Sequence, residues 1–203
     1  MNPFSQGWSN APLLSNNAPG GTPSIYGVVP SHPLANGQPP AGVNLIRFTF
    51  VPSGSHSSIL NSLVTGSCGQ TYFRITTNST AHGYSVVQNA RFQNIAYIEW
   101  RSHPVVEIYN IVSKRNSAAW LVLSSNRSYR KMNAQGQSFR WIPDELNINL
   151  YSVDPSNPQF FGGISQAPDG GTTLNLTNEA LQLGMLEIFV VSALLLLCGR
   201  SID

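Results

Sequence analysis

The amino-acid sequence predicts a mainly β domain, in which about twelve antiparallel strands close into a barrel around a hydrophobic C-terminal α-helix. Three observations lead to this fold class. Residues 1–42 carry no charge, residues 45–176 alternate between apolar and polar side chains, and residues 183–198 are almost wholly apolar. We therefore divide the chain into an N-terminal tail and one domain, 43–203, with its central helix at 178–198.

The tail is defined by its composition. It holds 8 of the 14 prolines and 6 of the 17 glycines, interleaved with Ser and Asn. Such a segment buries too little apolar surface to offset the entropy of ordering it, so we expect it to be disordered. It also lacks the basic region and the apolar run of a secretory signal, so we expect a cytoplasmic protein that is not secreted.

Strands are predicted because apolar residues recur at every second position. Ile46, Phe48 and Phe50 share one face of the first strand, and Gly, Pro, Asn and Asp mark the turns between strands. No helical period intervenes, so neighbouring strands should pair antiparallel and form a barrel or sandwich. The predicted strands lie at 45–51, 59–65, 71–77, 83–88, 93–100, 105–112, 118–124, 127–132, 136–142, 146–150, 158–162 and 172–176.

The last element is a helix that must be buried on all sides. Thr177 or Asn178 can cap its start, Gly199 suits its end, and from 188 to 198 only Ser192 is not strongly apolar. Two burials fit: the barrel interior, or a membrane in which the helix anchors a cytosolic β domain. The apolar run is about 24 Å long as a helix, against roughly 30 Å of hydrocarbon, and it includes Glu187, so the barrel interior is favoured.

This layout resembles the tubby C-terminal-like superfamily, which includes the tubby domain, phospholipid scramblases and plant LURP-one-related proteins. The residues that carry the resemblance are the strand Ala96-Tyr97-Ile98-Glu99-Trp100, the segment Gly136-Gln137-Ser138-Phe139-Arg140-Trp141 and the apolar helix. Over residues 43–203 the chain is most similar to an uncharacterised fungal single-domain family with this layout. The resemblance implies a barrel filled by the terminal helix, and tubby domains bind phosphoinositide head groups through basic surface residues.

The comparable feature here is a basic stretch that contains no acid between Glu107 and Asp144. If its hairpins bring these side chains to one rim, they would form a site for phosphate or anionic lipid. The alternative is that they keep the sheet surface charged and its edges unpaired. The six predicted site residues are Lys114, Arg115, Arg127, Arg130, Lys131 and Arg140.

Other function classes find little support. The net charge of +2, with 10% charged residues, is too small for a nucleic-acid surface. Cys68 with His82 or His103 is the one combination suited to nucleophilic catalysis, and Cys68 lies in a turn-like segment. The histidines lack metal-ligand spacing, so no catalytic residue, metal or cofactor is expected. We expect a non-enzymatic module that binds anionic membrane lipid or a protein partner, with a purely structural role as the alternative.

Overall fold

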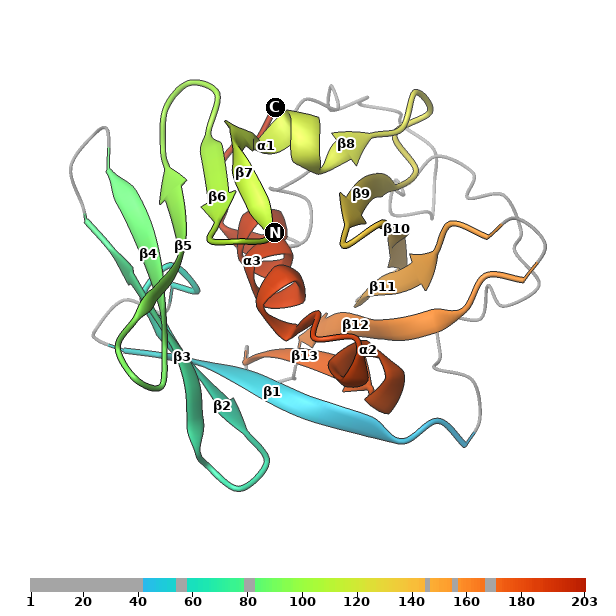
Figure 1. Ribbon diagram of the computed structural model, residues 1–203, viewed down its shortest axis with the longest axis horizontal. Coiled ribbons are helices and arrows are strands. Elements are labelled where there is room, and N and C mark those ends of the chain that lie inside the picture. Colours follow the sequence, from blue (N-terminus) through green and yellow to red (C-terminus); the bar gives the residue numbers. More distant parts are fainter. Residues whose placement is uncertain (1–41, 54–57, 79–82, 145–146, 155–156, 167–170) are drawn as a thin grey trace, which may run out of the picture.

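The computed structural model describes residues 42–53, 58–78, 83–144, 147–154, 157–166 and 171–203. These residues form one 13-stranded sheet and three helices (Figure 1). The strands are β1 Leu45–Pro52, β2 Ser62–Gly66, β3 Thr71–Thr77, β4 Tyr84–Asn89, β5 Asn94–Glu99, β6 Val105–Ile108, β7 Val112–Asn116, β8 Val122–Leu123, β9 Arg130–Ala134, β10 Gln137–Asp144, β11 Asn147–Ser152, β12 Phe160–Gln166 and β13 Thr172–Thr177. The helices are α1 Ser117–Trp120, α2 Asn178–Gln182 and α3 Leu186–Leu197.

All strand pairs are antiparallel, and the order across the sheet is β7-β6-β5-β4-β3-β2-β1-β13-β12-β11-β10-β9-β8. The prediction of a mainly β, antiparallel fold is confirmed. The predicted closure of the barrel is not confirmed, because no hydrogen-bonded strand pair joins β7 to β8 within the described part of the chain. Instead α1 connects these two edges and packs against both of them.

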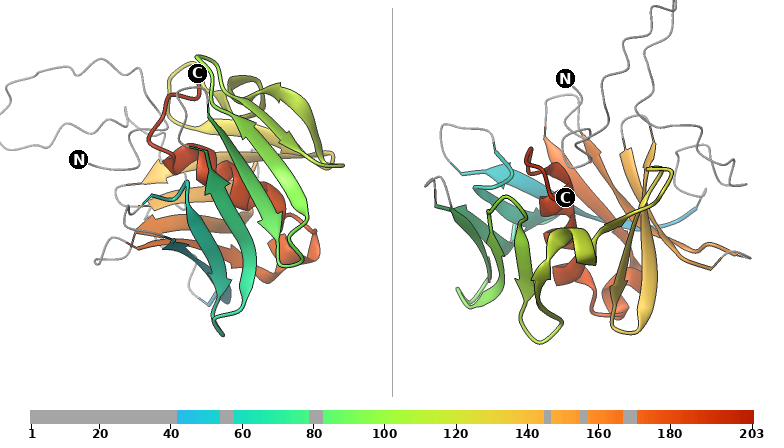
Figure 2. Two further views of the ribbon diagram at one scale, coloured as in Figure 1. Left: turned by 90° about the vertical axis from the view of Figure 1, so that its left-hand side faces the viewer. Right: turned by 90° about the horizontal axis from the view of Figure 1, so that it is seen from above.

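The sheet curls around α3, which lies within the curl in all three views (Figures 1 and 2). Strand alternation explains the core, because one face of each strand supplies apolar side chains to the helix. All residues from Ile188 to Leu196 are buried. The Phe189 ring makes edge contacts with Phe139 and Trp141 of β10, at centroid distances of 5.5 and 6.3 Å. Among the described residues, no helix combines the length and apolar character needed to cross a membrane.

The single helix predicted at 178–198 is wrong, because the structure has two helices separated at Leu183–Met185. Thr177 caps α2 as predicted, accepting a hydrogen bond from the Ala180 amide at 3.3 Å. Gly184 then adopts a φ of +67°, a left-handed conformation that ends the helix and is least strained for glycine. The chain can therefore turn on the surface at α2 before α3 enters the core.

Two strand predictions also differ from the structure. The range 105–112 is two strands, since Asn110 has a φ of +62° in a tight turn between β6 and β7. Asn tolerates this conformation, but the turn contains no Gly or Pro to signal it. The range 118–124 contains most of α1, which begins at Ser117, and the two-residue strand β8. The predicted disordered tail, 1–42, lies outside the described residues except for Gly42.

The segment that follows α3, Gly199–Asp203, contacts residues on both sides of the gap between β7 and β8. The Arg200 guanidinium lies 4.8 Å from the Trp100 ring centroid, just beyond β5. The Ser117 hydroxyl, at the start of α1, donates to the Ile202 carbonyl oxygen at 2.9 Å. Asp203 accepts two hydrogen bonds from Arg130 of β9. We call this gap between β7 and β8, crossed by α1 and by residues 199–203, the seam.

Candidate anion-binding face

The candidate site is built on β9 and β10, where alternation separates neighbouring basic residues. Arg130 and Met132 of β9 point into the core, so Lys131 between them points outward. Arg140 lies on the outer side of β10, between the buried residues Phe139 and Trp141. The hairpin register places Lys131 directly opposite Arg140.

Arg140 is held in place by an aromatic neighbour. Its guanidinium lies 5.5 Å from the ring centroid of Tyr129, which precedes β9. A cation over a tyrosine face is stabilised by the ring quadrupole, so the planar guanidinium is partly oriented before any ligand arrives. The Arg140 Nε is buried and makes no hydrogen bond with the described residues. The Tyr129 contact therefore presents an oriented guanidinium to an approaching anion, whereas its Nε atom is enclosed.

Arg127 lies at the exposed tip of the turn between β8 and β9. The Ser124 hydroxyl accepts from the backbone amides of Ser128 and Tyr129, at 3.0 and 3.2 Å. The Asn126 carboxamide accepts from the Ser128 hydroxyl at 2.7 Å. These bonds compact the turn and leave Arg127 itself with a φ of +57°. We call Arg127, Tyr129, Lys131 and Arg140 together the basic face.

The electrostatics of the basic face favour an anion. Like charges directly opposite one another on two strands destabilise a sheet by a few tenths of a kcal/mol to about 1 kcal/mol. Among the described residues, neither Lys131 nor Arg140 forms a salt bridge with a carboxylate. A phosphate group between the two cations would convert this repulsion into attraction, with charge-assisted hydrogen bonds from both.

The structure separates Lys114 and Arg115 from the basic face. Lys114 forms a salt bridge with Glu99 on the outer side of β5, and Arg101 contacts the same carboxylate at 2.5 Å. The hydrogen bond from Lys114 is the main cause that holds the pKa of Glu99 below its ordinary value. Arg115 turns back on its own strand, donating to the Ser113 carbonyl and hydroxyl oxygens at 3.1 and 2.7 Å.

The prediction that Arg130 lies on an exposed rim is wrong. Its side chain is fully buried, and one guanidinium nitrogen donates to the Leu121 carbonyl oxygen at 2.9 Å. Both terminal nitrogens donate to the two carboxylate oxygens of Asp203, at 2.9 and 2.6 Å. The physical reason is alternation: if Lys131 points outward, the adjacent Arg130 must point inward.

Sequence reasoning missed the partners of these basic residues. Glu99 lies outside the acid-free stretch, and Asp203 is 73 positions from Arg130. No local pattern reveals such long-range pairs. The role of Tyr129 was easier to predict from the sequence, because an aromatic residue beside a basic strand is a common partner for arginine.

Other chemistry is sparse in the described part of the chain. No group of three or more His, Cys, Asp or Glu side chains lies close enough to hold a metal ion there. Both cysteines are free: Cys68 is exposed, and burial raises the pKa of the Cys198 thiol to about 11. The Cys198 thiol also donates to the Leu195 carbonyl oxygen at 3.1 Å, as a buried residue of the helix end. His82, one of the two histidines considered as a partner for Cys68, lies outside the described residues.

Comparisons with known proteins add little to this geometry. No protein-family model and no curated protein matches the chain. Among solved structures, the X-ray structure of a protein from Arabidopsis thaliana is similar, with 10% sequence identity and a TM-score of 0.41. The match covers 73% of this chain and 91% of that chain. At this level the similarity does not bear on the tubby-like resemblance, which stays a prediction.

Proposed function

We propose that this protein is a non-enzymatic binding module that holds a phosphate-bearing anion, the head group of an anionic membrane lipid, on its basic face. The observation that carries the proposal is the pairing of Lys131 with Arg140 directly across the β9–β10 hairpin. Each lacks a carboxylate partner among the described residues, and Tyr129 orients the arginine. Arg127 extends from the adjacent turn and adds a third cation.

The proposal includes the finer architecture that the resemblance implies. The domain is a tubby-like barrel in which α1 and residues 199–203 take the place of strand pairing at the seam. In this arrangement α3 is a core element, and the protein associates with a cytoplasmic membrane surface through side chains of its outer face. The contacts of Ser117 with Ile202 and of Arg130 with Asp203 support this role for the seam.

The test is co-sedimentation with phosphatidylcholine vesicles that contain phosphatidylserine or a phosphoinositide, at low salt. Each cation near an anionic surface contributes about 1 kcal/mol. The double variant Lys131→Gln/Arg140→Gln should therefore bind about thirtyfold more weakly than the wild type. Binding of soluble inositol phosphate, measured by calorimetry, separates recognition of the phosphate from attraction to the membrane surface.

The matched control is Arg47→Gln/Arg91→Gln, which removes two exposed cations from other strands or turns. Both double variants lower the formal net charge from +2 to 0, that is, 2 minus 2. Vesicle binding that falls equally in both reports net charge alone and contradicts a site. Arg130 is left unchanged, because its loss would affect folding. Equal binding by the wild type and the Lys131/Arg140 variant rejects the proposal.

A further inference from the structure

The seam contains a groove that the lipid-binding proposal does not use. Beyond α1, a pocket of about 180 Å³ opens between the two sides of the seam. Cavities of about 150 Å³ hold a benzene molecule, so this one has room for a single apolar side chain. We call it the seam groove; its lining residues are Ile111, Val112, Arg115, Trp120, Asn133, Ala134, Gln135 and Gly136.

One wall of the seam groove is the free edge of a strand. Within the described residues β7 pairs only with β6, so its other edge carries unpaired backbone donors and acceptors. A β-bulge between β6 and β7 changes the alternation and sets Arg115 opposite the buried Val106, on the inner side of the sheet. Arg115 therefore faces the seam, whereas Lys114 reaches Glu99 on the outer side.

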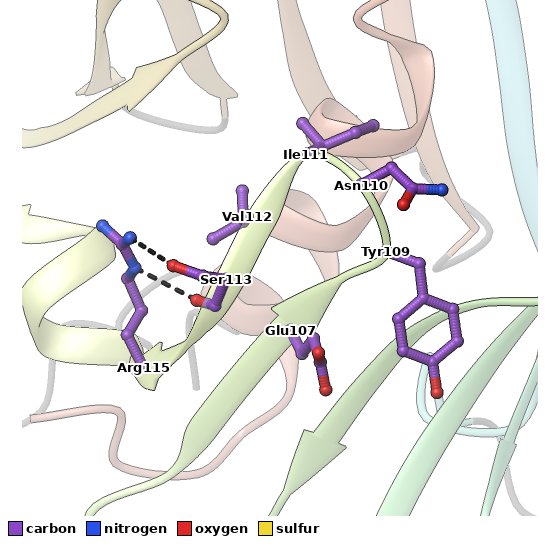
Figure 3. A pocket seen from close by; sticks show the side chains of 7 residues that line it. All are labelled: Glu107, Tyr109, Asn110, Ile111, Val112, Ser113 and Arg115. Carbon is purple, nitrogen blue, oxygen red and sulfur yellow. Dashed lines mark hydrogen bonds between the residues drawn. The ribbon is translucent and has the colours of Figure 1, made fainter.

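The Arg115 side chain lies along this edge, but it does not bring a hydrogen-bond partner from another strand or helix to it. Among the described residues, its guanidinium hydrogen-bonds with Ser113 alone, two residues away on the same strand (Figure 3). It also lines a second, open pocket of about 710 Å³ along the β6–β7 hairpin, whose lining includes Glu107 and Tyr109. A side chain that bonds with its own strand can turn to an incoming partner at little cost.

Trp120 supplies an independent observation. Its side chain is 3% exposed and lines the seam groove, yet its indole N–H has no acceptor among the described residues. An unsatisfied buried donor costs about 1 to 3 kcal/mol. By contrast, the indole N–H of Trp100 donates to the Ser85 hydroxyl at 2.7 Å. An acceptor on a bound molecule would remove the cost at Trp120.

We propose that the seam groove binds an extended, acidic peptide segment of another protein, which adds to β7 as a further strand. A carboxylate of the segment accepts from Arg115, and a peptide carbonyl accepts from the Trp120 indole. Strand addition of this kind derives affinity from backbone hydrogen bonds and specificity from alternate side chains.

Charge argues for a foreign acidic strand and against a second copy of this chain. Antiparallel pairing of two β7 strands centred on Lys114 would set the two Lys114 side chains opposite each other. Basic residues on an edge commonly prevent self-association, although each Lys114 is already paired with Glu99 of its own chain. An acidic strand would instead meet Arg115, which forms no salt bridge with a carboxylate among the described residues. Its apolar side chain, two positions from the acid, would enter the pocket beside Val112.

The experiment uses the full chain and the fluorescent peptide Thr-Val-Thr-Glu-Thr-Val-Thr, whose alternation matches this geometry. Anisotropy measures affinity, and amide hydrogen exchange measures whether Ser113–Asn116 become protected. The expected result is saturable binding, protection of β7 and a shift of the Trp120 indole N–H resonance. Arg115→Gln should weaken binding about tenfold, and Trp120→Phe, which keeps a smaller aromatic ring and removes the donor, about fivefold.

The controls separate the ion pair, the backbone pairing and the lipid site. With glutamine in place of the peptide's glutamate, the wild type and Arg115→Gln should bind equally. A proline-substituted peptide, which lacks backbone donors, should not protect β7. Arg91→Gln and the Lys131/Arg140 variant should bind the peptide like the wild type.

Three outcomes overturn the proposal. One is the absence of saturable binding up to about 1 mM peptide, the weakest affinity of interest. Another is equal affinity of the wild type and Arg115→Gln for the glutamate peptide. The third is concentration-dependent protection of β7 without peptide, together with a dimer in sedimentation, which would assign this edge to a second copy of the chain.

Discussion

Replacing Asp203 with Asn tests whether the buried ion pair secures the seam. The fully buried Arg130 guanidinium has charge-assisted hydrogen bonds to both Asp203 oxygens and one further bond to the Leu121 carbonyl oxygen. Asn keeps the size of the side chain and one acceptor oxygen, but it removes the negative charge. The variant therefore removes the negative charge of the Asp203 side chain from beside a buried positive charge.

The expected loss in free energy of unfolding follows from the exposed fractions of the Arg130 and Asp203 side chains. Removing one partner of a buried pair typically destabilises a protein by about 3 to 5 kcal/mol. The Asp203 side chain is 26% exposed, so water can reach the space beside Arg130 and the lower end applies. A loss of about 3 kcal/mol in a domain of this size lowers Tm by about 6 to 12 °C.

Urea denaturation followed by tryptophan fluorescence measures this loss. The double variant Arg130→Met/Asp203→Leu removes both charges and should recover most of it, because apolar replacement of a buried pair is often neutral. The exposed Asp154→Asn is the control and should change the free energy of unfolding by less than about 0.5 kcal/mol. The reasoning is refuted if Asp203→Asn is as stable as wild type, or if the double variant is no more stable than the single one.

Two further predictions concern the pH dependence and the packing of the sheet. Burial raises the pKa of Glu187, so the folded state binds its proton more tightly and stability falls as pH rises from the unfolded pKa through the folded one. Glu187→Gln should thus gain stability relative to wild type as pH rises above the unfolded pKa of about 4.3, and parallel pH profiles would contradict this. At Gly162, with a φ of +150°, an added Cβ would lie 2.2 Å from the Asn175 carbonyl oxygen, so Gly162→Ala should cost about 3 kcal/mol or more in urea denaturation. Gly69→Ala, with a φ of +78° and open space, should cost only about 1 kcal/mol, and equal losses would show that the close approach is unimportant.

Most strands could be predicted because their signal is local. Phe48 and Phe50 of β1 are buried and the intervening Thr49 is not, as the alternation requires. The β6–β7 turn could not be predicted in the same way, because Asn110 adopts its left-handed conformation inside an uninterrupted apolar pattern. Helix α1 has four residues, too few to show a helical period. Both errors concern β7, β8 and the helix between them, which are the edges that would have to pair for the sheet to close into a barrel.

In the candidate site, too, the local features could be predicted from the sequence and the long-range contacts could not. That Lys131 and Arg140 are neighbours follows from one hairpin, whose turn residues lie between them in the sequence. Alternation also implies that Arg130 and Lys131 point to opposite faces, and it places Arg130 on the face of the apolar residues Met132 and Ala134. The sequence does not reveal the counter-charge, because the contact of Arg130 with Asp203 joins residues 73 positions apart. Charge clusters in a strand therefore need to be separated by face before they are assigned to a surface.

The low content of charged residues makes the exposed sheet edges at the seam harder to protect from pairing with other chains. An open sheet exposes two edges that can pair with other chains, and a chain with 10% charged residues has few side chains to prevent it. Three features meet at this position: α1 covers part of both edges, Asp203 is paired with Arg130 of β9, and Arg115 bonds with the Ser113 carbonyl of β7. Two of the six predicted site residues thus act at the seam: Arg130 stabilises it, and Arg115 covers part of the β7 edge. Their clustering in sequence reflects the edges of the sheet, and only Arg127, Lys131 and Arg140 remain for the proposed anion site.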